Sequence, residues 1–177
     1  TVKSYVDRQC LEMIGRFSQK TIIENTQELS RALHDAIVLG HTSIIENFIA
    51  NRSLDFHDSQ GRTLFHCLAQ LGYLPALEFL LTKPDIPINK PDFHGNTPLH
   101  LAVKSNFPNI VESLLKADTD PNALNNQSFS PLHLAILEKN IASMRLLLEY
   151  GADPNLITPY GFSPIQICYL QNLYQGA

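Results

Sequence analysis

The chain has few glycines and no long hydrophobic run. Its 8 glycines among 177 residues form no glycine-rich loop of the kind that cradles phosphate groups, so we expect no nucleotide site of that type. No stretch approaches the roughly 18 consecutive apolar residues of a transmembrane helix. The first residues also lack the basic and then apolar order of a signal peptide. We therefore expect no association with a membrane.

Cysteine is rare as well. Cys10, Cys67 and Cys168 are far apart and odd in number, which argues against a disulfide framework. No two of them have the close spacing of zinc ligands. We interpret them as buried thiols of an intracellular, reducing compartment.

The net charge and the apolar content limit which classes of protein this chain can belong to. A net charge of −4 and a pI near 5.9 argue against a surface that binds nucleic acid. An apolar content of 44% in 177 residues is enough for a sizeable core in a single domain.

A block of residues recurs along the chain with a period of about 33 residues. Each copy opens its central motif with threonine or serine, and these positions are separated by 34, 33 and 33 residues. An apolar stretch and a loop that ends in asparagine follow the block. A regular period of this kind predicts an architecture of stacked repeats. The copies are DSQGRTLFHCL at 58–68, DFHGNTPLHLA at 92–102, NNQSFSPLHLA at 125–135 and TPYGFSPIQIC at 158–168.

The chemistry of the block predicts a pair of short helices in each repeat. Threonine or serine can accept a hydrogen bond from the free N–H groups of a helix start. In three of the four copies proline follows at the first helical position, where a missing N–H costs nothing. Such helices are too short to be stable alone, so their apolar faces must be buried by neighbouring repeats. The expected apolar faces include Leu99, Ala102 and Val103 in a first helix, and in the second helices Ile44, Ile45, Phe48 and Ile49, then Leu77, Leu80 and Leu81, then Ile110, Val111, Leu114 and Leu115, then Met144, Leu147 and Leu148.

The motif resembles that of the ankyrin repeat family. TPLHLA at 97–102 and SPLHLA at 130–135 carry the resemblance, together with LLLEYGADPN at 146–155. It covers roughly residues 25–170, and the first copy, around Leu33–Ala36, is degenerate. The resemblance implies an all-α solenoid of stacked helix pairs joined by β-hairpin-like loops. We expect four repeats, at 25–56, 57–89, 90–122 and 123–155, and a truncated fifth at 156–177.

The two ends depart from the repeat. Residues 2–20 carry apolar side chains at helical spacing, which predicts an amphipathic helix within an N-terminal segment, 1–24. We expect this helix to cap the first repeat; the alternatives are a partner-docking helix or the end of an upstream domain. In the last repeat, Ile165, Ile167, Leu170 and Leu173 make an apolar face. Either the chain belongs to a longer protein or something covers this face.

Four histidines, His34, His66, His100 and His133, recur with the repeat, but a metal site is not expected. Packed helices hold equivalent positions about 10 Å apart, whereas zinc–ligand bonds are about 2 Å long. The resemblance implies that these histidines form structural hydrogen bonds, and that Gln166 does the same in the last repeat. Nor does the sequence indicate catalysis. Asp118 and Asp120 resemble a general acid/base pair. However, Asp153 occupies the same repeat position, so we interpret these aspartates as part of the repeat pattern. We expect no enzymatic activity, cofactor or small-molecule substrate.

The resemblance implies a concave binding face built from the hairpin tips and the exposed side of each first helix. Aromatic residues are unusual at exposed turns and are enriched at protein interfaces, which favours a role in binding for those found here. The alternative is that some of these rings pack against a neighbouring hairpin. Mapping by repeat register gives the candidate contacts His57, Gln60, Arg62, Phe93, His94, Asn96, Lys104, Asn126, Gln127, Phe129, Glu138, Tyr160 and Phe162.

The sequence therefore predicts a monomeric, non-catalytic module that binds a partner protein, with Phe93 and Phe129 as anchors. A second hypothesis is a targeting or regulatory domain of a larger enzyme. A structural spacer is a third, against which the aromatic tips argue. The composition, rich in Asn, Ile and Leu, resembles that of ankyrin proteins from intracellular bacteria, which implies a host protein as the partner.

Overall fold

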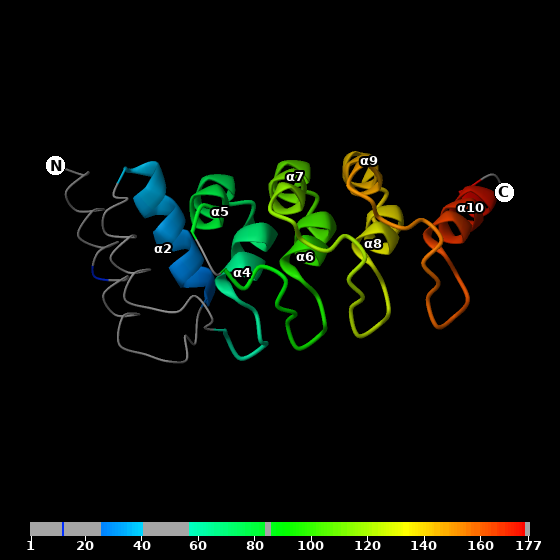
Figure 1. The fold of residues 1–177 in the computed structure, drawn as a ribbon, viewed down its shortest axis with the longest axis horizontal. Coiled ribbons are helices and arrows are strands. Elements are labelled where there is room, and N and C mark those ends of the chain that lie inside the picture. The colour runs from blue at the N-terminus through cyan, green and yellow to red at the C-terminus, as the bar shows by residue number, and fades with distance from the viewer. Residues whose placement is uncertain (1–11, 13–25, 41–56, 84–85, 176–177) are drawn as a thin grey trace.

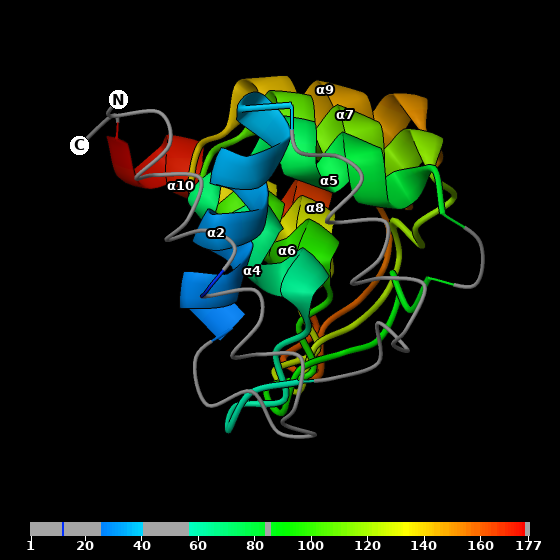
Figure 2. The same cartoon turned by 90° about the vertical axis from the view of Figure 1, so that its left-hand side faces the viewer.

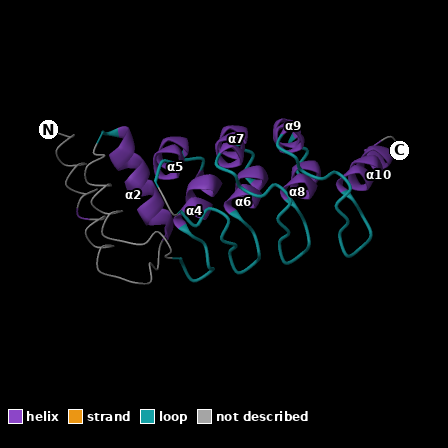
Figure 3. Ribbon diagram, in the orientation of Figure 1, coloured by secondary structure: helices purple, strands orange, loops and turns teal. Residues whose placement is uncertain are grey.

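The computed structural model describes residue 12 and residues 26–40, 57–83 and 86–175. This part of the chain is helical and contains no strand (Figures 1 and 3). His57 and Thr63 form an isolated antiparallel bridge at the base of one hairpin loop. The helices are α2 (Thr26–Val38), α4 (Leu64–Leu71), α5 (Leu74–Leu81), α6 (Pro98–Lys104), α7 (Pro108–Lys116), α8 (Pro131–Leu137), α9 (Ile141–Glu149) and α10 (Pro164–Gln175).

The pairs α4–α5, α6–α7 and α8–α9 are antiparallel and stack along one axis, with α2 and α10 at the two ends of the described stack (Figure 1). α4, α6 and α8 are the first helices of their pairs and pack against one another as an inner row, which α10 continues. α5, α7 and α9 form an outer row. The loops that precede the inner helices project to one side of both rows (Figure 2). The all-α solenoid predicted from the sequence is confirmed.

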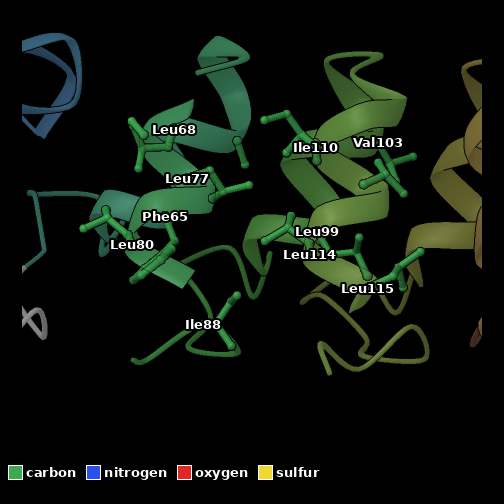
Figure 4. Packing of buried hydrophobic residues seen from close by; sticks show 14 of the residues in the cluster. Phe65, Leu68, Leu77, Leu80, Ile88, Leu99, Val103, Ile110, Leu114 and Leu115 are labelled. Carbon is green, nitrogen blue, oxygen red and sulfur yellow. The ribbon is translucent and has the colours of Figure 1, made fainter. Parts of the chain in front are cut away.

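The core lies between the two rows. Leu99 and Leu132, at equivalent positions of α6 and α8, are buried together with Ile110 and Leu114 of α7 (Figure 4). These side chains belong to one buried cluster that extends across successive pairs, which is how a solenoid buries short helices. The apolar faces predicted for the second helices are mostly right. Leu148 is an exception, because half of its surface is exposed.

Proline and the residue before it define the helix starts. Pro98 and Pro131 occupy the first turn of α6 and α8, after Thr97 and Ser130 in extended conformation. Proline loses nothing there because the first N–H groups of a helix have no internal acceptor. The inner helices therefore begin at the same spacing as the sequence motif.

Two sequence predictions have other outcomes. The N-terminal amphipathic helix, Cys10 and the apolar face around 44–49 lie outside the described residues. The prediction of buried thiols is right for Cys67 and wrong for Cys168, which is exposed on α10. Ile165 and Tyr169 of α10 are also exposed.

Candidate partner-binding groove

A recurring histidine ties the inner helices α4 and α6 to the next hairpin. In α6, the backbone N–H of Thr97 donates to Nδ1 of His100 at 3.1 Å, and the Nε2 of His100 lies 3.0 Å from the backbone carbonyl of Phe129. A backbone N–H can only donate, so Nδ1 carries no proton and Nε2 must donate to the carbonyl. The hydrogen bonds thus select the neutral imidazole with its proton on Nε2. His66 makes the same two bonds, to Thr63 at 3.0 Å and to Asn96 at 2.7 Å.

Burial keeps these imidazoles neutral. It lowers the pKa of His100 from 6.5 to about 4, although the carbonyl of Phe129 acts in the opposite direction. Burial also lowers the pKa of His66 and of His133. A proton on Nδ1 would place two donors face to face, so protonation and the observed geometry exclude each other. The structural role that the resemblance implied is therefore confirmed in both bonds of His66 and His100, whereas His133, among the described residues, makes only the bond to its own helix start, Ser130.

The ends of the stack vary this arrangement. In α10, Oε1 of Gln166 accepts the N–H of Ser163 at 2.8 Å, as the imidazole nitrogen does elsewhere. His34, aligned with the same column, instead stacks on Tyr73 with ring centroids 4.3 Å apart. Its equivalent N-cap position, Arg31, lies inside α2 rather than before it. The degenerate first copy of the motif thus lacks the capping role.

A short side chain at the start of each hairpin shapes the tip. Oδ1 of Asp92 accepts the backbone N–H groups of His94 and Asn96, each at 2.8 Å. Oδ1 of Asn125 accepts the N–H groups two and four residues later in the same way. Asp58 does so in the preceding hairpin. We did not predict these positioning residues. The sequence signal that could have identified them is the recurrence of Asp or Asn at the start of each of these hairpins. The side chains of Asp and Asn typically accept a hydrogen bond from the backbone two residues later.

Neighbouring tips are joined through their backbones. The N–H of Phe93 donates to the carbonyl of Gln60 at 2.9 Å, and the N–H of Asn126 donates to the carbonyl of His94 at 2.9 Å. The side-chain amide of Asn126 also donates to the carbonyl of Phe93 at 2.9 Å. These bonds hold successive tips side by side, so the side chains they carry are arranged in advance of binding.

A polar hollow lies where two of these hairpins meet α6 and α8. Its volume is about 340 Å³. Five of the predicted contact residues line it, from two successive repeats: His94, Asn96, Lys104, Asn126 and Gln127, and Asn125 and Leu134 complete the lining. Residues far apart in the sequence, such as Lys104 and Gln127, are therefore brought to one site.

The other predicted contacts lie outside this hollow. Arg62 is half-buried and bonded to Asp58 at 2.8 Å and to Gln70 at 3.3 Å, so its guanidinium stabilises its own hairpin. His57 is half-buried beside Phe93, whereas Gln60 is exposed at its tip. Glu138 is exposed at the end of α8, and the last hairpin exposes Tyr160 and Phe162.

The two expected anchors differ in exposure. Phe93 is 63% exposed, but one side of its ring lies against Gly61 of the preceding hairpin. Phe129 is half-buried, with its ring centroid 5.9 Å from that of His133. The expectation of an exposed ring at Phe129 is therefore wrong. Its position in the hairpin corresponds to that of Asn96 rather than that of Phe93, and its carbonyl anchors His100.

Comparison with known families agrees with the helix pairs and the capping histidines. The family model described as ankyrin repeats (3 copies) matches residues 33–125 and 86–158. The chain belongs to the ankyrin repeat family. Ankyrin repeats are a protein–protein interaction module, and the hollow lies among the hairpin tips and inner helices that such a module presents.

Relatives of this ankyrin chain include proteins of very different length. A putative ankyrin repeat protein of Rickettsia bellii is 31% identical over 130 residues, which are 59% of this chain and 71% of the relative. The palmitoyltransferase AKR1 of Eremothecium gossypii is 38% identical over 63 residues, 36% of this chain but 9% of the relative. The nuclear factor NF-kappa-B p105 subunit of Rattus norvegicus is 30% identical over 125 residues, 68% of this chain and 13% of that protein.

The helices that the structure describes are all too short or too polar to span a membrane.

Proposed function

We propose that this ankyrin domain is a non-catalytic module that binds an extended segment of a partner protein across the tips of the hairpins that begin at Asp58, Asp92 and Asn125. The observation that carries the proposal is the polar hollow. It gathers predicted contact residues from two repeats, and its side chains are held on tips that are already bonded to one another. A surface arranged in this way loses little conformational freedom on binding, which favours affinity.

An aromatic side chain on the same hairpin tip as His94 supports the same surface. Phe93 exposes 63% of its area one residue from His94. Burial of a phenylalanine side chain contributes about 1.5–3 kcal/mol. A partner that crosses the hollow and covers this ring gains both polar contacts and apolar burial. We therefore keep Phe93 as the proposed anchor and place Phe129 in the fold.

Peptide display tests this proposal. Random peptides are selected on the immobilised domain, and the affinity of a selected peptide is measured for His94→Ala/Gln127→Ala and for Arg145→Ala. Arg145 is exposed on α9, in the outer row, and serves as the control. We expect at least a tenfold loss for the first variant and none for the second. The reverse pattern would place the binding surface on the outer helices and refute the proposal.

A second candidate is a targeting or regulatory domain within a larger protein. The observation in its favour is that this chain matches only 9% of the palmitoyltransferase and 10% of a probable serine/threonine-protein kinase from Dictyostelium discoideum. The two candidates are compatible, because a regulatory domain also acts by binding. The gene sequence on both sides of this chain tests it: a flanking catalytic domain supports this role, and its absence contradicts it.

The Rickettsia relative supports a narrower form of the proposal. We propose that the module acts inside a cell, in a reducing compartment, and that its partner is a host protein. Purification of partners from eukaryotic and bacterial lysates, each with the wild type and the His94→Ala/Gln127→Ala variant, tests this. A partner that comes from the bacterial lysate alone would contradict it.

A further inference from the structure

The hollow beside α6 is lined by hydrogen-bond donors that the protein itself leaves unused. Lys104 is exposed at the end of α6, and its ammonium makes no ion pair or hydrogen bond within the described residues. The ring of His94 and the side-chain amide of Gln127 likewise bond to nothing in that part of the chain. All three line the same hollow, so a bound group would meet them together.

The fourth donor follows from a chain of hydrogen bonds. The backbone N–H groups of Gln127 and Phe129 both donate to one side-chain atom of Asn125, each at 3.0 Å. That atom must be an oxygen, because an N–H group needs an acceptor. The other end of Asn125 is therefore an NH₂ group, and it donates to Asn96 at 3.0 Å. The contacted atom of Asn96 is then its oxygen, which leaves the NH₂ of Asn96 as a donor without a described acceptor.

No carboxylate lines the hollow to balance these donors. Asp92 is nearby in sequence, but it is buried, and its Oδ1 already accepts the N–H groups of His94 and Asn96. Glu138 is exposed at the end of α8 and does not take part in the lining. The unused donors of the hollow are therefore one ammonium, the NH₂ groups of Asn96 and Gln127, and an imidazole; Asn126 also lines the hollow, but its NH₂ already donates to Phe93.

We propose that this hollow binds the carboxylate of an Asp or Glu side chain from an extended segment of the partner protein. This inference rests on the proposed function, since it assigns one contact within the same groove. Lys104 supplies the charge, and the NH₂ groups of Asn96 and Gln127 supply directed donors to the two carboxylate oxygens. Charge-assisted bonds of this kind are stronger than neutral ones. One lysine balances the single charge of a carboxylate but leaves a phosphate, with nearly two charges, partly unbalanced.

A double-mutant cycle on a selected peptide tests the carboxylate site. Peptides chosen by display on the wild-type domain are resynthesised with each Glu changed to Gln or each Asp changed to Asn, and with phosphoserine at the same place. Affinities are measured for the wild type, Lys104→Met and Lys116→Met. The last variant removes the same charge from α7 in the outer row, where Lys116 forms an exposed ion pair with Glu112. Thermal unfolding of each variant verifies that the fold is retained.

We expect one acidic peptide residue whose conversion to the amide weakens binding about tenfold to the wild type and has little effect on binding to Lys104→Met. Lys116→Met should bind as the wild type does. Lys104→Met and the amide peptide could instead each weaken binding with losses of binding free energy that simply add. In that case the carboxylate lies elsewhere and this inference is wrong. Tighter binding of the phosphoserine peptide would also overturn it.

The proposed function can survive that failure. Peptides that depend on His94 and Gln127 but not on any acidic residue would leave the groove as the binding surface and refute the carboxylate site alone. Peptides that are insensitive to every groove substitution would refute both.

Discussion

His100 of α6 donates from Nε2 to the backbone carbonyl of Phe129, 29 residues later, at 3.0 Å. Its Nδ1 accepts from Thr97 at the start of its own helix. One neutral imidazole therefore joins a helix start in one repeat to a hairpin in the next. The stability of the stack and the placement of the binding tips depend on the same hydrogen bonds.

The first prediction concerns pH. The folded protein lowers the pKa of His100 from 6.5 to about 4, so the unfolded chain binds a proton more readily. The contribution of neutral His100 to the free energy of unfolding should be fully present above pH 6.5. It should decrease as the pH falls toward 4 and change little below that pH. The pKa difference corresponds to about 3 kcal/mol. Urea unfolding measured at intervals between pH 7 and pH 4 would show the decline.

His100→Gln is the matched control for this prediction, because Gln166 already caps α10 through its side-chain oxygen. The variant keeps an acceptor for Thr97 and cannot titrate. We expect it to be less stable at pH 7, since the bond to Phe129 is lost, and to depend less on pH. An equally steep decline in the variant would assign the pH dependence to other groups.

The second prediction concerns the core. Leu99→Ala should destabilise the domain by about 2–5 kcal/mol, the range for truncation of a buried leucine. Leu99 is fully buried between neighbouring pairs, whereas Leu137 on α8 is 41% exposed. Leu137→Ala should therefore cost much less. Thermal or urea unfolding compares the two, and similar losses would contradict the assignment of the core.

The third prediction concerns Gly61, whose φ of +74° and contact with Phe93 both disfavour a side chain. A Cβ at this position would lie 2.5 Å from Cδ1 of Phe93. Gly61→Ala should therefore cost more than the roughly 1–2 kcal/mol of a left-handed residue. Gly161 has a similar φ of +80° with nothing within 4 Å, so Gly161→Ala measures the backbone cost alone.

Phe93→Ala should relieve the steric part of that cost. In the Gly61→Ala background, removal of the ring should recover stability until only the backbone cost remains. A double variant as unstable as the sum of both single variants would show that the ring does not rest on Gly61 in solution.

The fourth prediction separates the two aromatic residues. Phe93→Ala should weaken partner binding about tenfold or more and change the melting temperature little, because its ring is mostly exposed. Phe129→Ala should lower the melting temperature, because its ring is half-buried near His133. Calorimetric titration of a selected peptide, with thermal unfolding of both variants, distinguishes these roles. A large loss of stability in Phe93→Ala would make that ring part of the fold.

The sequence by itself determined the solenoid, the helix starts and the sites of the hairpins. These features depend on local chemistry that recurs with the repeat: Thr97 and Ser130 before proline, and apolar positions such as Leu99 and Leu132 at helical spacing. The family resemblance, mapped by repeat register, also brought His94, Asn96 and Gln127 into the list of candidate contacts. Each of these inferences needs only the period, the chemistry of a single repeat and the family resemblance that they carry.

Only the tertiary structure decided how neighbouring repeats use equivalent residues. Phe93 and Phe129 are both aromatic and both lie in hairpins, yet one ring is exposed over Gly61 and the other is half-buried near His133. Lys104 and Gln127 share a hollow because successive tips are bonded side by side. Exposure and shared cavities depend on atoms from adjacent repeats, and the pattern of one repeat does not contain that information.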